Sequence, residues 1–240
     1  MHARPPVHPR ATADRFVAER ANLTTFLKDR LEDVFVVHRL DKETSGVILF
    51  AKNAAAHRNL SMQFEARTVD KIYLALVEGS VHKEEGEINQ PIANNMRDKG
   101  RMIIASRGKP SLTLYQVIER FKNYTLVEAN IKTGRTHQVR VHFEVIGYPL
   151  AVDSLYGRKD AFLLSEVKMK KYRSGKGVIE EKPLMSRTTL HAAKVTLRLK
   201  PHSPSSSQLP SSYFYGWPWH SRWCDHSSGR LPVIQMHSMA

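Results

Sequence analysis

Cysteine is almost absent from this sequence of 240 residues, since Cys224 is the only one. A single cysteine excludes an internal disulfide and a zinc site built on several thiolates. No run of 18 apolar residues occurs, which argues against a membrane-spanning helix, and residues 1–10 lack the apolar stretch of a secretory signal. We therefore expect a protein of the reducing cytoplasm, with no membrane or metal partner.

Acidic residues are also scarce. The 23 aspartates and glutamates stand against 37 lysines and arginines, which gives a net charge of +14 and a pI near 10.0. Such an excess favours an anionic partner, and nucleic acid is the commonest large one. The plainer alternative is a basic surface that binds nothing.

Residues 201–240 differ in composition from the rest of the chain. They contain no lysine, but they hold ten serines, five prolines and all three tryptophans. No period of 2 or 3.6 residues runs through them, so we expect an irregular or disordered tail. The main domain is expected over residues 34–200, and residues 1–33 are expected to be a shortened start of it.

Strand and helix patterns alternate along the main domain. Period-2 alternation and short β-rich runs predict strands at residues 34–37, 47–51, 71–78, 111–118, 124–131 and 191–199. Asn53 should cap a first helix, and Thr136 should cap a second over residues 137–146, which Gly147 ends. This strand-rich order with few helices predicts an α+β (mixed α/β) domain.

The stretch HRLDKETSG, residues 38–46, places Asp41 between two predicted strands, with Arg39 and Lys42 close by. Neighbouring cations favour the ionised carboxylate. A carboxylate on a loop at strand ends can act as a nucleophile or a base. Taken locally, a turn aspartate in a structural salt bridge explains these residues at least as well.

A second polar stretch, TGRTHQVRVH at residues 133–142, puts Arg135 in a turn before the second predicted helix. A basic turn together with helix N-terminal amides suits an anion, either a phosphate or a partner carboxylate. An ordinary polar helix start is the alternative. A metal site on His137 and His142 does not fit, because side chains five residues apart point to different sides of a helix.

Together these motifs resemble the RluA family of pseudouridine synthases. The chain reads HRLDKETSG, then KIYLALVEG, then TGRTHQVRVH followed by IGYPLAVDSLYG, and finally TLHAAKVTL. The family pattern HRLD-x-x-TSG is present at every fixed position. The resemblance implies the pseudouridine synthase fold, in which a largely antiparallel mixed central sheet is flanked by helices and carries an active-site cleft.

The resemblance also implies a reaction, the isomerisation of uridine in rRNA or tRNA to pseudouridine. Asp41 would be the catalytic carboxylate, Tyr73 would stack against the uracil, and Arg135 would hold the carboxylate in place. The target nucleotide must leave the stacked helix to be reached. No metal or organic cofactor is implied, and a monomer is expected because no heptad or apolar stripe stands out.

Further residues are expected to contact RNA. They are His38, Arg39, Thr136, His137, Gln138, Val139, Arg140, Lys171 and Arg173, the last two from the basic stretch at residues 168–177. Arg39 is the candidate to brace the site that the extruded nucleotide leaves, because a guanidinium stacks on bases. Asp153 is expected to be a structural turn residue.

Two other functions agree with fewer of these observations. A non-catalytic RNA-binding protein with the same fold would be expected to have lost a catalytic position, and none is lost. A hydrolase that uses Ser, His and Asp would be expected to show a G-x-S-x-G elbow, which this sequence lacks.

Overall fold

The computed structural model describes residues 23–167 and 181–198, which fall into two compact units. Described residues up to Lys42, Gly46–Val69 and those from Val195 onward form the first unit, and Glu43–Ser45 with Asp70–Lys194 form the second. The tail 201–240 and the basic stretch 168–177, with Lys171 and Arg173, lie outside the described residues, so the predicted domain limits stay predictions. Among the described residues, no helix combines the length and apolar character needed to cross a bilayer.

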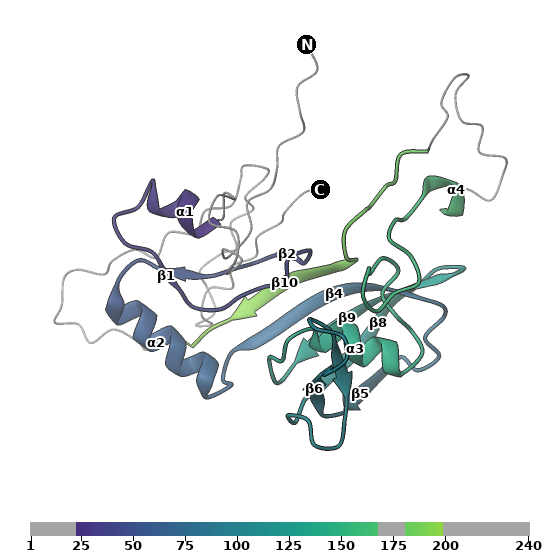
Figure 1. Ribbon diagram of the computed structural model, residues 1–240, viewed down its shortest axis with the longest axis horizontal. Coiled ribbons are helices and arrows are strands. Elements are labelled where there is room, and N and C mark those ends of the chain that lie inside the picture. The colour runs from purple at the N-terminus through teal and green to yellow at the C-terminus, as the bar shows by residue number, and fades with distance from the viewer. Residues whose placement is uncertain (1–22, 168–180, 199–240) are drawn as a thin grey trace, which may run out of the picture. The chain divides into compact units, whose positions relative to one another are not determined.

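A six-stranded sheet in the order β2-β10-β4-β9-β8-β5 dominates the second unit (Figure 1). Its strands are β2 (Ser45–Gly46), β10 (Leu190–Thr196), β4 (Asp70–Glu78), β9 (Tyr124–Ile131), β8 (Leu112–Arg120) and β5 (Glu85–Asn89). The pairs β4–β9, β8–β9 and β5–β8 are antiparallel. The predicted α+β class and largely antiparallel sheet are therefore confirmed.

Alternation along the central strands builds the core of the second unit. Tyr73, Ala75 and Val77 of β4 face the core, as do Val127 and Ala129 of β9. The strand register sets Tyr73 opposite Ala129 and Ala75 opposite Val127, so these side chains pack across the strand pair. The inner face of β4 thereby fixes the position of Tyr73.

Helix α3 (Gln138–Val145) packs on β8 and β9 (Figure 1). Val139 and Phe143, one helical turn apart, are buried in the core, and Gly147 ends the helix at φ 87° as predicted. The predicted cap at Thr136 is wrong. The N-cap is His137, which is left-handed at φ 56° and makes no side-chain capping hydrogen bond. The chain enters the helix through this left-handed residue, so Thr136 lies outside it.

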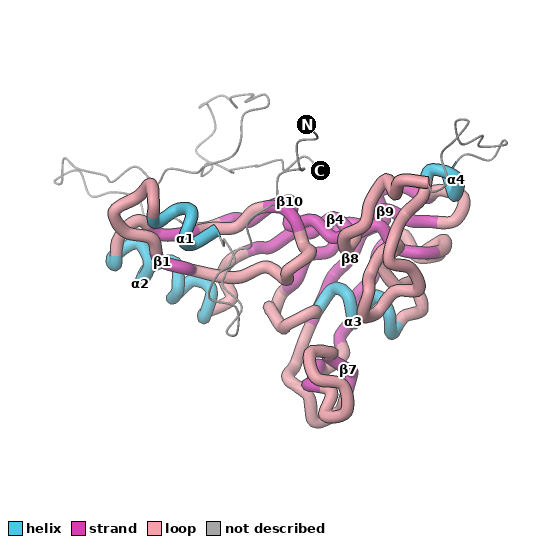
Figure 2. The backbone as a smooth tube through the Cα atoms, turned by 45° about the horizontal axis from the view of Figure 1, so that its top comes forward, coloured by secondary structure: helices cyan, strands magenta, loops and turns pink. Residues whose placement is uncertain are grey.

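Strands β6 (Ile92–Asn94) and β7 (Met102–Ile104) form a two-stranded hairpin that lies between β5 and β8 in the sequence. Figure 2 shows the loop around β7 projecting away from the sheet. Strands this short carry no readable alternation, and the sequence did not predict them. The short helix α4 (Leu164–Val167) completes the described elements of the second unit.

The first unit contains α1 (Leu23–Lys28), α2 (Ala54–Glu65) and the antiparallel pair β1 (Phe35–Val36) and β3 (Phe50–Ala51). The predicted cap of α2 is confirmed, since the Asn53 side chain accepts the N–H of Ala56 at 2.8 Å. Val47 and Leu49 pack with Val69 in a small core. The strand predicted over residues 47–51 is thus only partly regular, because only its last two residues pair with β1.

Candidate active site

The predicted catalytic residues lie on three different elements. Asp41 is a half-buried residue of the loop between β1 and β2, in the first unit. Tyr73 is on β4, and Arg135 is in the turn between β9 and α3, both in the second unit.

The residues before Asp41 are held within the first unit by His38. Its Nε2 accepts the N–H of Leu49 at 3.0 Å, and its ring stacks on Phe64 with centroids 4.9 Å apart. These contacts give His38, predicted to touch RNA, a part in holding the loop. Arg39 is exposed beside it.

Glu43 and Ser45, which follow Asp41, are anchored within the second unit to β10 and to the residues just before it. Glu43 accepts the hydroxyl of Thr188 at 3.1 Å, and the hydroxyl of Ser45 hydrogen-bonds His191 Nδ1 at 2.8 Å. The acidic and small residues of HRLDKETSG therefore have structural partners of their own.

A buried lysine connects the strand of Tyr73 with the turn of Arg135. Lys71, two residues before Tyr73 on β4, donates from Nζ to the carbonyl of Thr133 at 2.7 Å. A Cβ on Gly134 would lie 3.3 Å from the same Nζ, so the ammonium sits directly behind the turn. Lys71 was not among the site residues predicted from the sequence. The sequence pattern that could have revealed it is a lysine on the same strand face as Tyr73, Ala75 and Val77.

Gln138 is the hub that shapes the Arg135 turn. Its Oε1 accepts from the hydroxyl of Thr133 at 2.7 Å and from the N–H of Arg135 at 3.0 Å. Its amide donates to the carbonyl of Leu112 at 2.9 Å and to the hydroxyl of Thr113 at 3.0 Å. Because Gln138 is buried and its donors and acceptor are engaged in the protein, it has a structural role, and its RNA contact stays a prediction.

Replacement of Gln138 by methionine is expected to lower the free energy of unfolding by about 1–3 kcal/mol, because it leaves buried polar groups without partners. Urea denaturation measures this. Gln116→Met, at an exposed side chain of β8, is the matched control and should change stability little. Equal stability in the two variants would contradict the role given to Gln138.

His142 extends the same network into the core. The hydroxyl of Thr113 lies 2.9 Å from Nδ1, and Nε2 lies 3.0 Å from the carbonyl of Gln90. The carbonyl can only accept, so Nε2 carries the proton and Nδ1 accepts from Thr113. Burial lowers the pKa of His142 below 6.5, against the opposing effect of the Gln90 carbonyl.

Acidification is therefore expected to destabilise the fold through His142. Below pH 6.5, the pKa of histidine in the unfolded chain, the unfolded state binds a proton at His142 that the folded state does not bind. The contribution of His142 to stability is therefore present above pH 6.5 and is lost as the pH falls toward the lower pKa of the folded state. The slope attributable to His142 reaches at most about 1.4 kcal/mol per pH unit. Urea unfolding at several pH values measures it. His142→Gln keeps one donor and one acceptor without the titration, and an identical pH slope in this variant would contradict the assignment.

Arg140 and Asp153 form a buried ion pair. The guanidinium donates from Nε at 2.6 Å and from a terminal nitrogen at 2.7 Å to the two carboxylate oxygens, with side-chain exposures of 6% and 0%. Burial alone would raise the pKa of Asp153, but Arg140 and the N–H groups of Leu155 and Tyr156 hold that pKa below its ordinary value. Arg140 is thus engaged inside the protein and its RNA contact stays a prediction, while Asp153 has a structural partner.

Tyr156 joins this ion pair to the projecting hairpin. Its hydroxyl accepts the N–H of Met102 at 2.6 Å and hydrogen-bonds His137 Nδ1 at 2.8 Å. Burial raises the pKa of Tyr156 to about 12, so it is a neutral phenol at any physiological pH. His137, predicted to touch RNA, thus has a partner inside the protein, and Val139 is buried in the core.

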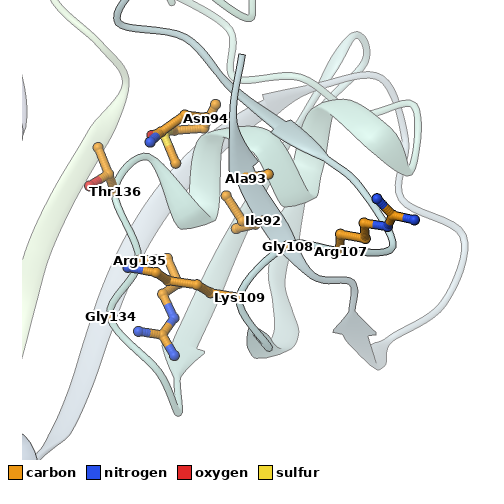
Figure 3. A pocket seen from close by; sticks show the side chains of 10 residues that line it. Ile92, Ala93, Asn94, Arg107, Gly108, Lys109, Gly134, Arg135 and Thr136 are labelled. Carbon is orange, nitrogen blue, oxygen red and sulfur yellow. The ribbon is translucent and has the colours of Figure 1, made fainter. Parts of the chain in front are cut away.

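A pocket of about 360 Å³ opens between the hairpin and the Arg135 turn. In the view of Figure 3, Arg135 and Lys109 lie at one end, and Arg107 lies on the side opposite Thr136. The residues that line it are Ile92, Ala93, Asn94, Met102, Arg107, Gly108, Lys109, Gly134, Arg135 and Thr136. Three are cationic and none is acidic, so the pocket favours an anion.

Comparisons with known proteins agree with this fold. The family described as RNA pseudouridylate synthase matches residues 5–145. The solved structure of human RNA Pseudouridylate Synthase Domain Containing 1 superposes with a TM-score of 0.56 at 31% identity, covering 72% of this chain and 68% of that one. The chain thus has a pseudouridine synthase fold.

Part of this chain is also similar in sequence to curated bacterial proteins. An uncharacterized RNA pseudouridine synthase of Aquifex aeolicus is 48% identical over 55% of this chain and 42% of its own length. Ribosomal large subunit pseudouridine synthase D of Nitrosomonas europaea is 46% identical over 51% of this chain and 36% of its own. The corresponding synthase C of Haemophilus influenzae is 46% identical over 52% of this chain and 39% of its own.

This chain belongs to the RluA family of RNA pseudouridine synthases. The matched region spans well under half the length of these three curated relatives.

Proposed function

We propose that this chain is an RNA pseudouridine synthase, which isomerises specific uridines of RNA to pseudouridine. The observation that carries the proposal is the complete HRLDKETSG motif in a chain that matches the family over residues 5–145. In this reaction the bond from uracil N1 to C1′ breaks, the base turns, and C5 bonds to C1′. The C5 hydrogen leaves as a proton and N1 gains one, so no redox partner or cofactor is required.

Asp41 would act on the extruded nucleotide, by attack at C1′ or C6 or by assisting cleavage of the glycosidic bond. Tyr73, held by the core face of β4, would stack on the uracil, a contact worth about 1–3 kcal/mol. Arg135 would hold the carboxylate of Asp41 in place. Exposed Arg39 would stack where the base has left, which offsets part of the few kcal/mol that extrusion costs.

The substrate class is proposed to be rRNA or tRNA. The relatives named as ribosomal large subunit synthases support rRNA, and the net charge of +14 supports affinity for a polyanion. We propose that the protein acts in the cytoplasm as a monomer and without metal.

Nucleoside analysis tests this proposal. Unmodified transcripts of large-subunit rRNA segments and of tRNA are incubated separately with the protein, digested, and analysed by chromatography and mass spectrometry after cyanoethylation, which separates pseudouridine from isobaric uridine. Pseudouridine in one transcript, absent with Asp41→Ala, is the expected result. Tight RNA binding with no pseudouridine in any transcript would favour the non-catalytic RNA-binding alternative.

A further inference from the structure

The pocket between the β6–β7 hairpin and the Arg135 turn has cations that the protein itself does not neutralise. Within residues 23–167 and 181–198, the side chains of Arg107 and Lys109 make no ion pair or hydrogen bond, and both are exposed. In the same described part of the chain, the side chain of Arg135 donates only from Nε, to the carbonyl of Pro110 at 3.2 Å. The proposed function assigns its terminal guanidinium nitrogens to the Asp41 carboxylate, so Arg107 and Lys109 are the cations that the pocket offers to a ligand.

The backbone on the hairpin side of the pocket is firmly fixed. Lys109 exchanges two backbone hydrogen bonds with Ile92, at 2.8 and 3.0 Å, and Gly108 closes a turn onto the carbonyl of Ala105 at 2.8 Å. A Cβ on Gly108 would lie 2.7 Å from the carbonyl carbon of Ile92, so this loop packs against backbone where only glycine fits. Arg107 and Lys109 thus project from a rigid turn.

The opposite wall is equally well held. Gln138 binds the hydroxyl of Thr133 and the N–H of Arg135, and Lys71 binds the carbonyl of Thr133 from behind. The hydroxyl of buried Tyr156 accepts the N–H of Met102 on the hairpin and also hydrogen-bonds His137 at the start of α3. It therefore links the hairpin to this wall. A preformed cationic pocket loses little entropy when an anion binds.

The lining identifies the chemistry of the ligand. Arg107, Lys109, the amide of Asn94 and the hydroxyl of Thr136 provide charge and hydrogen bonds for phosphate oxygens, and no carboxylate lines the pocket. The volume of about 360 Å³ falls within the range of about 300–1,000 Å³ that is usual for small ligand sites, and it suits one nucleotide unit rather than a helix.

We propose that this pocket binds a backbone phosphate of the RNA next to the target uridine, with Arg107 and Lys109 as its contacts on the hairpin. The proposal rests on the RNA substrate proposed above. Arg107 and Lys109 act in binding and positioning, and they take no part in the chemical step.

The salt dependence of RNA binding tests this assignment. The Arg107→Ala/Lys109→Ala variant is expected to weaken binding and to reduce the slope of log Kd against log salt concentration by about 0.7 to 1, the effect of losing the contact to one phosphate. Lys83→Ala/Lys182→Ala removes the same charge from exposed positions that do not line the pocket and should leave the slope nearly unchanged. Equal slopes in the two double variants would overturn the proposal.

Single methylphosphonate substitutions in the RNA locate the contact. The wild type should lose affinity when one linkage beside the target uridine is neutralised, and the Arg107→Ala/Lys109→Ala variant should be insensitive at that linkage while its kcat at saturating RNA is unchanged. If the variant lost as much affinity as the wild type at each substituted linkage, that result would also overturn the proposal. A wild type that binds RNA through this pocket without forming pseudouridine would refute the proposed function and leave the phosphate site standing.

Discussion

Replacement of Asp41 by asparagine is expected to abolish uridine isomerisation and to leave RNA binding intact. Asparagine has the shape of aspartate but is neither a nucleophile nor a base, so the rate should fall by at least about 10²–10⁴-fold. The substitution also removes a negative charge, so affinity for the polyanion should stay equal or rise slightly. Single-turnover kinetics on the responsive transcript and fluorescence anisotropy with the same RNA measure the two effects.

Asp33→Asn is the matched control for this experiment. Asp33 is an exposed carboxylate in the same unit, just before β1, and its replacement makes the same change in charge. It should keep full activity. Near-normal turnover by Asp41→Asn would remove the aspartate from the mechanism, and a parallel loss of RNA binding and activity would assign it to binding.

Replacement of Arg140 by alanine is expected to destabilise the fold more than any other change discussed. It leaves the carboxylate of Asp153 buried at 0% side-chain exposure without its cation, which costs about 3–5 kcal/mol. A domain of this size is stable by about 5–15 kcal/mol, so a large part of its stability would be lost. Urea denaturation followed by circular dichroism measures the loss.

Arg101→Ala provides the comparison that isolates burial. Arg101 also forms an ion pair, with Glu144 at 2.6 Å, and its guanidinium also lies over the ring of Tyr156, at 5.2 Å against 4.9 Å for Arg140. Its pair is about one-third exposed, and such pairs contribute about 0–1 kcal/mol. Similar losses in the two variants would contradict the structural role of Arg140. An Arg140→Ala variant of normal stability that binds RNA weakly would support the predicted RNA contact of Arg140.

The elements with strong periodicity were predictable from the sequence. The alternation of KIYLALVE predicts β4 and the side that carries Tyr73, and the predicted bounds of β9 agree with the observed strand. Asn53 has both the residue type and the position of a helix cap, and it acts as one. Position-specific motifs also identified the family, because their order and length leave little room for coincidence.

Long-range pairing explains most of what the sequence did not predict. Nothing in TGRTHQVRVH distinguishes an arginine that reaches RNA from one that pairs with a carboxylate 13 residues later, as Arg140 does with Asp153. In the sequence Gln138 is an ordinary polar residue at a helix start, and only the fold brings it next to Leu112 of β8, to which it donates a hydrogen bond. The left-handed entry at His137 and the three-residue strands of the hairpin have no signal in local periodicity. The phosphate pocket joins segments some 25 residues apart, such as Lys109 and Gly134, which only the fold brings together.

Tritium release from RNA labelled at uridine C5 tests the central claim most directly. Isomerisation bonds C5 to the sugar and must release its hydrogen to water, so the count in solvent reports the reaction itself. We expect release from an rRNA or tRNA transcript with the wild-type protein and none with Asp41→Asn. Release that is equal in both proteins, or no release from any transcript by a folded protein that binds RNA, would contradict the proposed function.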